Sequence, residues 1–303
     1  MNLTGQYIAS RADVTLRAQR LILVPILAFA LSLLAIPALA QDGGGDAKVK
    51  ELKTTFAAAM SAAKQGNAQE AYPKLEKSLQ LANEAEQSGA ASQIEERMVA
   101  LAKNWGNKAL KNKKYEEAMM HFKKGAEYAP NDAYMVYGMG LAQINQDGMM
   151  DQAIQTLQKT ISVAEENGDR KTSNLATERI RQEFVARASQ ALSVQNPGPS
   201  AAQEALTALD EMRQYVDPSA KSLFYRATAL HAQGNFAEAI STAEKGLEMH
   251  RGSRTSAAKY HFVIAESQMK NGDKSAACSR FQQSSYGDYR ARSEHYLENE
   301  CSN

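Results

Sequence analysis

The chain has few of the residues that build cross-linked or metal-held modules. Among its 303 residues there are two cysteines, five histidines and one tryptophan. Two cysteines are too few for a disulfide-dense scaffold or a cysteine-rich zinc module. Only seven prolines are present, while Ala, Gln, Glu and Lys are abundant. This composition favours helices over strands.

The sequence also lacks an excess of charge of either sign. Thirty-five Lys and Arg residues stand against 34 Asp and Glu residues, which gives a formal net charge of +1. This balance excludes a protein whose overall field attracts nucleic acid. Hydrophobic residues make up 44% of the chain and charged residues 23%. The chain can therefore form a core, and wholesale disorder is not expected.

Motifs that carry chemistry are absent from the sequence. It contains no G-x-S-x-G, no phosphate-binding glycine loop and no H-E-x-x-H. No metal-ligand spacing joins the histidines to one another or to the cysteines. We therefore expect a non-enzymatic protein without cofactor or metal. An active site assembled from distant residues is the alternative.

The first forty residues are typical of a secretory signal peptide. Three arginines precede an uncharged run over 21–36, and a small-x-small sequence ends at Ala40. We predict cleavage between Ala40 and Gln41, a flexible linker over 41–48, and a periplasmic or secreted product. The alternative is a retained membrane anchor, although the run is shorter than the roughly 20 residues of a span.

Self-comparison reveals a repeating unit in the rest of the chain. Six hexapeptides can be aligned, and each ends in alanine: Ala71, Ala118, Ala153, Ala205, Ala239 and Ala277. An apolar residue follows each alanine, a mostly large residue stands four positions later, and a mostly small one seven positions later. These offsets form one stripe of an α-helix. A second helical stretch precedes each hexapeptide, so each unit is predicted to be a helical hairpin.

The best unit, residues 98–130, resembles the tetratricopeptide repeat family. It matches the repeat motif at Trp105-Gly106, Tyr115, Ala118, Phe122 and Pro130. A second good unit covers 220–250, a third covers 132–168 with one extra turn residue, and the others match only through the hexapeptide. The resemblance extends over about residues 50–286. It assigns these repeat-packing positions: Gly106, Ala118, Phe122, Gly140, Ala153, Leu157, Ala205, Leu209, Ala239, Ala277 and Phe281.

The resemblance implies an all-α, right-handed superhelical solenoid of about six hairpins over 49–286. Residues 287–303 are then expected to form a capping helix and tail, because the last repeat would otherwise expose its apolar face. The sequence Asn196-Pro197-Gly198-Pro199 interrupts the stack after a long helix at about 172–194. We expect a kink or a groove-lining elbow near 168–200. Asp217-Pro218 is predicted to end the next helix.

The two cysteines lie on either side of the predicted turn before the capping helix. The midpoint between Cys278 and Cys301 falls close to Gly287-Asp288. Residues equidistant from the turn of an antiparallel hairpin lie opposite each other. Because an exported protein meets oxidising conditions, we predict a disulfide between them. The alternative is a small buried Cys278 and a free thiol at Cys301.

Members of this family usually bind ligands on the concave face, which the first helix of each repeat builds. The motif places these residues there: Lys103, Asn104, Asn107, Tyr134, Tyr137, Lys221, Phe224, Thr228, His231, Lys259, Phe262 and Glu266. Aromatic, amide and cationic groups together suit an extended peptide. Lys103 and Asn107 match the first two positions of the family's carboxylate clamp. Gly138 stands at the next position and the paired cations are missing, so a complete clamp is not expected.

These observations predict a non-catalytic protein- or peptide-binding scaffold or assembly factor of the cell envelope. Its partner would be an envelope protein or peptide, with no nucleic acid and no membrane span after cleavage. One alternative is an envelope-polymer (carbohydrate) binding or processing protein that uses 168–200. Another is a structural spacer. The lysine cluster over 103–114 is interpreted as an offset to a helix dipole, with an acidic-ligand patch as the alternative.

Overall fold

The computed structural model describes residues 47–194 and 197–302, and the regular elements in these ranges are helices, without strands. The chain divides into two compact units, one up to Met98 and one from Val99 onward. The boundary falls inside α4 (Ser88–Lys111), so each unit contains part of this helix. The predicted signal peptide and its cleavage site at Ala40 and Gln41 lie outside the described residues.

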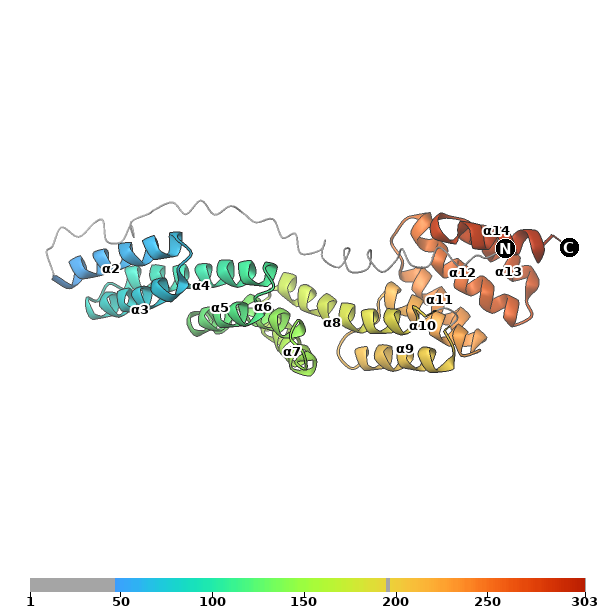
Figure 1. The fold of residues 1–303 in the computed structure, drawn as a ribbon, viewed down its shortest axis with the longest axis horizontal. Coiled ribbons are helices and arrows are strands. Elements are labelled where there is room, and N and C mark those ends of the chain that lie inside the picture. Colours follow the sequence, from blue (N-terminus) through green and yellow to red (C-terminus); the bar gives the residue numbers. More distant parts are fainter. Residues whose placement is uncertain (1–46, 195–196, 303) are drawn as a thin grey trace. The chain divides into compact units, whose positions relative to one another are not determined.

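The first unit contains a helical hairpin followed by the start of α4. The hairpin consists of α2 (Ala47–Lys64) and α3 (Ala68–Glu84) (Figure 1). Helix α2 begins two residues before the predicted start of the repeat region at residue 49. Leu52 and Leu75 have no exposed surface, and they form part of the core between the two helices.

The second unit continues as helical pairs. After α4, its helices are α5 (Tyr115–Tyr128), α6 (Ala133–Ile144), α7 (Met150–Glu166), α8 (Arg170–Ala191), α9 (Pro199–Met212), α10 (Ala220–Ala232), α11 (Phe236–Met249), α12 (Arg254–Lys270) and α13 (Lys274–Ser284). The 3-10 turn η4 (Gly287–Tyr289) and α14 (Arg290–Asn299) follow. Helices α6 and α7, α8 and α9, α10 and α11, and α12 and α13 pack in pairs (Figure 1). The predicted all-α stack of hairpins with a final capping helix is confirmed.

The alanines of the six hexapeptides are fully buried. Each has 0% exposed surface: Ala71, Ala118, Ala153, Ala205, Ala239 and Ala277. The residues four positions later are at most 1% exposed: Leu75, Phe122, Leu157, Leu209, Ala243 and Phe281. The pattern of alternating small and large residues therefore identifies the side of each second helix that faces the core.

Phe122 shows why small residues are needed beside these large ones. A Cβ atom on Gly138 would lie 2.4 Å from the Phe122 ring, and one on Gly106 would lie 2.7 Å from it. Both glycines thus leave room for the ring between α4, α5 and α6. Gly140 does the same for Leu157, at 2.8 Å. The glycine that departs from the clamp motif, Gly138, has a packing role.

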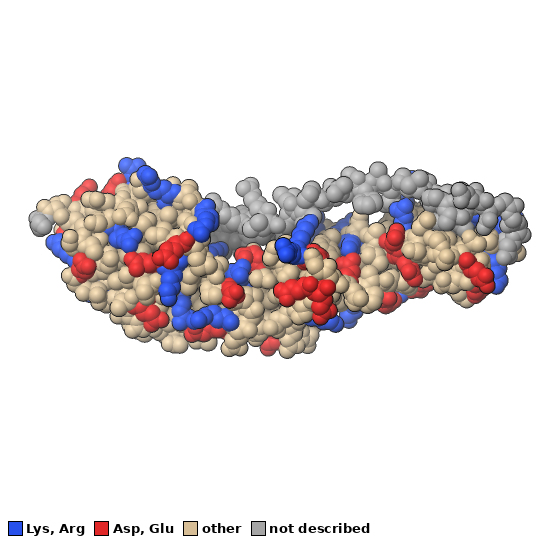
Figure 2. All heavy atoms as spheres, turned by 180° about the vertical axis from the view of Figure 1, so that it is seen from behind, with Lys and Arg blue, Asp and Glu red and all other residues tan. Residues whose placement is uncertain are grey.

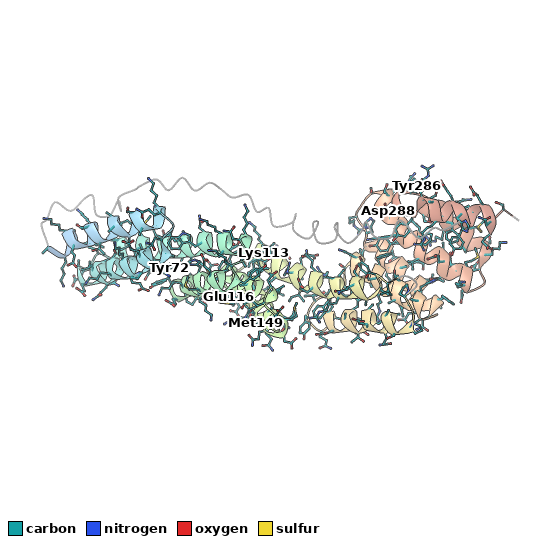
Figure 3. The ribbon with its side chains drawn as sticks, viewed as in Figure 1. Tyr72, Lys113, Glu116, Met149, Tyr286 and Asp288 are labelled. Atoms are coloured by element: carbon teal, nitrogen blue, oxygen red, sulfur yellow. A yellow bond between two sulfur atoms is a disulfide. The ribbon has the colours of Figure 1, made fainter. Side chains whose placement is uncertain are left out.

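Most turns between helices contain a residue in the left-handed backbone region. Five of these residues are glycines with φ between 69° and 91°: Gly66, Gly148, Gly168, Gly234 and Gly272. In the turn between α4 and α5 the residue is Lys113, with φ of 59° (Figure 3). The hexapeptide alignment places Lys113 at the glycine position. The side chain costs this turn about 1 kcal/mol relative to glycine.

The interruption after α8 agrees with the predicted long helix. Helix α8 spans Arg170–Ala191, and α9 begins with Pro199 in its first turn. The predicted end of α9 is wrong, because that helix ends at Met212 rather than at Asp217-Pro218. Residues beyond Met212 turn back toward α8, where Tyr215 stacks on Phe184 with ring centroids 5.7 Å apart. Beyond Glu211, the backbone N–H groups of Gln214 and Tyr215 donate three residues back, to Glu211 and Met212, which is the pattern of a turn.

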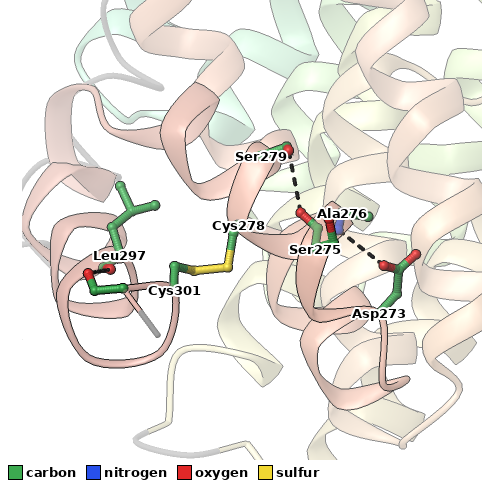
Figure 4. The surroundings of a disulfide bond; sticks show 8 residues. Asp273, Ser275, Ala276, Cys278, Ser279, Leu297 and Cys301 are labelled. Atoms are coloured by element: carbon green, nitrogen blue, oxygen red, sulfur yellow. Dashed lines mark hydrogen bonds between the residues drawn. A yellow bond between two sulfur atoms is a disulfide. The ribbon is translucent and has the colours of Figure 1, made fainter.

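The predicted cap and disulfide are both present. Cys278 on α13 is bonded to Cys301 after α14, with a Cα–Cα distance of 5.7 Å (Figure 4). Tyr296 of α14 stacks on Phe281 at a centroid distance of 4.3 Å. In the part of the chain that the structure describes, no helix combines the length and apolar character needed to cross a membrane.

Candidate binding face of the first helices

The first helices of successive hairpins lie close to one another in the second unit. Helix α6 contacts α8, α8 contacts α10, and α10 contacts α12, whereas α7, α9 and α11 make their main contacts only with the helices adjacent in sequence. The first helices therefore share one continuous face. We call this the first-helix face, formed by α4 from Val99 onward and by α6, α8, α10 and α12.

At the α4–α6 end of this face, the polar groups are satisfied within the chain. The ammonium of Lys103 lies 2.6 Å from a carboxylate oxygen of Asp132. The other oxygen of Asp132 caps α6 by accepting a hydrogen bond from the backbone N–H of Tyr134 at 3.0 Å. The Tyr134 hydroxyl donates to Asn107 at 3.1 Å. Lys103 and Asn107, the two clamp-like residues, are thus already paired, whereas the predicted Asn104 is simply exposed.

Helix α8 adds a charged pair to the middle of the face. Arg179 and Glu183 lie 2.6 Å apart, and their side chains are each 19% exposed. Burial raises the pKa of the neighbouring Tyr137 to about 12, although the charge of Arg179 opposes this shift. The sequence prediction contained no residue from α8. The unit that contains α8 matches the repeat motif only through its hexapeptide, which lies on the second helix, α9. No motif position could therefore be assigned on the first helix, α8.

At the α10–α12 end, a lysine lies over aromatic rings. The Lys259 ammonium is 4.9 Å from the centroid of Phe224 and 5.1 Å from that of Tyr260. The two rings meet edge to face at 5.7 Å. Burial lowers the pKa of Lys259, and the positive charge of Lys221 lowers it further. The predicted residues Lys221, Phe224 and Lys259 are therefore brought together.

Two other predicted residues on α10 are engaged locally. The Thr228 hydroxyl donates to the Phe224 carbonyl of its own helix at 2.9 Å. His231 lies 2.9 Å from the Ser267 hydroxyl on α12. Burial, together with Lys270 and Arg292, lowers the pKa of His231. Thr228 therefore bonds within its own helix, whereas His231 joins α10 to α12.

The prediction that Phe262 and Glu266 line the ligand-binding face is wrong. Phe262 is only 2% exposed, and the guanidinium of Arg292 lies 4.2 Å from its ring centroid. Glu266 accepts hydrogen bonds from Arg292 at 3.1 Å and from the Tyr296 hydroxyl at 3.3 Å. Burial raises the pKa of Glu266, although Arg292 opposes this. The capping helix α14 covers both residues, so they bind the cap and are not exposed to a ligand.

Charges of both signs are interspersed over the surface, and the view in Figure 2 shows no large field of one sign. Lys108 and Lys111 lie in the last turn of α4, where cations offset the helix dipole, and Lys114 pairs with Glu117 at 2.9 Å. Within the described ranges, no three His, Cys, Asp or Glu side chains are grouped so that they could hold a metal ion.

Comparison with known proteins agrees with the hairpin stack. Residues 134–183, which span α6, α7 and the first part of α8, match the tetratricopeptide repeat model. The chain thus contains a tetratricopeptide repeat over these residues. Among solved structures, that of the MamA protein is similar, with 15% identity and a TM-score of 0.35 over 67% of this chain and 95% of that one. A likeness this distant carries no argument about function. No curated protein matches the sequence.

Proposed function

We propose that the protein is a non-catalytic scaffold or assembly factor of the cell envelope that binds a protein or peptide on its first-helix face. The observation that carries this proposal is the set of partly exposed aromatic side chains along that face, Tyr134, Tyr137 and Phe224. Amide and cationic groups lie beside them. Such rings give a bound segment apolar contact area, while the polar groups fix its orientation.

Photo-crosslinking tests the face directly. A photoreactive amino acid at position 137 or 224 of the full chain should crosslink to the same envelope protein, because both positions lie on one continuous surface. The matched control is position 155, an exposed glutamine on the second helix α7. Crosslinks of equal yield from position 155, or none from the other two, would contradict a specific binding face.

The export of the protein is a further part of the proposal. The signal-peptide pattern over residues 1–40 and the Cys278–Cys301 disulfide both support it, because disulfides persist mainly in oxidising compartments. N-terminal sequencing of the protein from a periplasmic or secreted fraction should begin at Gln41. A chain that begins at Met1 in the membrane fraction would indicate a retained anchor instead.

No observation favours the envelope-polymer alternative. A cavity of about 560 Å³ lies beside the interruption between α8 and α9. Its described lining contains small, aliphatic and amide side chains and one glutamate, Glu204, without an aromatic ring. It therefore offers no flat ring on which a sugar could stack. We keep the protein- or peptide-binding function as the single proposal.

A further inference from the structure

Lys259 is a half-buried cation that has no acidic partner among the described residues. Its ammonium is held over Phe224 and Tyr260, and no carboxylate of the described residues forms an ion pair with it or with Lys221. The groups that act on its charge are the surrounding apolar atoms and a second cation, and both disfavour it. Attraction to the ring faces offsets only part of the cost of this burial.

The same face contains a lysine in the opposite situation. Lys103 also lies near a tyrosine ring, with its ammonium 5.6 Å from the Tyr134 centroid. However, it is neutralised by Asp132 at 2.6 Å. Among the described residues, an acidic partner is therefore what Lys259 lacks and Lys103 already has.

We propose that Lys221 and Lys259, with the Phe224 ring beside them, form a site for a carboxylate of an acidic peptide. This inference rests on the proposed function and names the chemistry of the partner. A bound carboxylate would supply the missing counter-charge for two cations at once. Charge-assisted hydrogen bonds of this kind are about twice as strong as neutral ones. The exposed part of Phe224 would contact the neighbouring apolar atoms of the peptide.

The carboxylate can come from an Asp or Glu side chain or from the C-terminus of the peptide. The probe is a hexapeptide that alternates leucine and glutamate, labelled at its N-terminus with an uncharged BODIPY dye and prepared with a free and with an amidated C-terminus. Its leucine–glutamine counterpart, amidated, is the neutral control. Retained binding of the amidated acidic form assigns the site to side-chain carboxylates, whereas loss of binding on amidation assigns it to the terminal carboxylate.

Binding is measured by fluorescence anisotropy with the full mature chain and three variants. Lys259→Met keeps the aliphatic stem over the rings and removes the charge, so the affinity for the acidic peptide should fall at least tenfold. Lys259→Arg restores the charge and should keep the affinity within about threefold. Lys103→Met is the matched control and should change it less than twofold, because that lysine is already paired. Lys221→Met should also lower the affinity for the acidic peptide. Because position 221 is exposed, this measurement does not depend on packing around Lys259.

Three results would overturn the inference: no binding of the acidic peptide by the unchanged protein, equal binding by Lys259→Met, or an equal loss in Lys103→Met. Crosslinking from position 224 in the Lys259→Met background separates this failure from failure of the proposed function. If the envelope partner is still captured there, the face binds proteins without recognising a carboxylate.

Discussion

Two lysines on the first-helix face have opposite surroundings. Lys103 on α4 is paired with Asp132, which also caps α6, so its charge is part of the internal structure of the stack. Lys259 on α12 lies over two aromatic rings and next to Lys221, and no acid in the part of the chain that the structure describes neutralises it. Two lysines of the same face can thus differ in whether an acid of a neighbouring element pairs with them.

The two ends of the second unit are also held together differently. Around α4 and α6, two glycines leave room for Phe122, so the helices approach closely. Around α12 and α13, the short helix α14 follows the hairpin. The covalent bond between Cys278 and Cys301 holds α14 over the apolar rings. Close packing stabilises one end, and a cross-link stabilises the other.

Among the variants that test this comparison, removal of the disulfide should have the largest effect on stability. The Cys278→Ser and Cys301→Ser double variant should lose about 3 kcal/mol of unfolding free energy, because the 23-residue separation is no longer closed in the unfolded chain. Hydrogen exchange should rise in α13 and α14 and stay unchanged in α5 and α6. Reductant added to the double variant is the control and should do nothing. Equal loss of protection at both ends would mean that the unit unfolds as one.

Gly138→Ala should destabilise the packing around α4, α5 and α6. The new Cβ would lie 2.4 Å from the Phe122 ring, between helices that cannot move apart without losing core contacts. We expect a loss of about 2 kcal/mol in urea unfolding. Gly140→Ala is a matched control with a smaller expected loss, because its Cβ would meet the end of the flexible Leu157 side chain at 2.8 Å. If the two variants are equally stable, the glycines do not set the approach of the helices.

The repeat register was predictable because it depends on positions close in sequence. The six alanines and the residues four positions later are one helical stripe, and any stack of hairpins buries such a stripe. The disulfide was predictable for the same reason, because Cys278 and Cys301 flank a single turn. These features need no knowledge of how distant hairpins meet.

The character of the binding face was less predictable, because it depends on contacts about 36 residues apart. The position of Lys259 over Phe224 joins α12 to α10, and no local pattern predicts it. Phe262 was assigned to the face from its place in the motif, but in the last hairpin the cap covers that place. Arg179 and Glu183 were missed because the first helix of their unit carries no recognisable motif.

Asp132→Asn should make the two lysines alike. Asparagine still caps α6, so the helix start is preserved, but the charge opposite Lys103 is removed. The loss of stability should be about 0.5 kcal/mol, as for other partly exposed ion pairs. The variant should then bind a second acidic hexapeptide at the α4–α6 end, weaker than the first, which titration calorimetry would detect as a change of stoichiometry from one to two. An unchanged stoichiometry would show that an unpaired lysine alone does not make the site.

The smallest expected effect concerns two histidines, whose charged surroundings differ as those of the two lysines do. Burial lowers the pKa of His121 near α4, but Glu117, 3.8 Å away, opposes the shift. Burial also lowers the pKa of His231 on α10, and there the cations Lys270 and Arg292 add to it. Each histidine is therefore more easily protonated in the unfolded chain. Its contribution to stability is full above the unfolded value of about 6.5 and is lost as the pH falls from there toward the folded value.

No acid of the described residues opposes the shift at His231, so its pH dependence should be the steeper of the two. His231→Gln should therefore reduce the loss of stability between pH 7 and pH 5 more than His121→Gln does, by a few tenths of a kcal/mol. Thermal unfolding at both pH values measures this, and NMR titration of the two imidazoles checks that His231 has the lower pKa. If His121 titrates lower instead, the acid beside it does not compensate for burial. The contrast between an acid-paired group and a group without an acid among the described residues would then be limited to the two lysines.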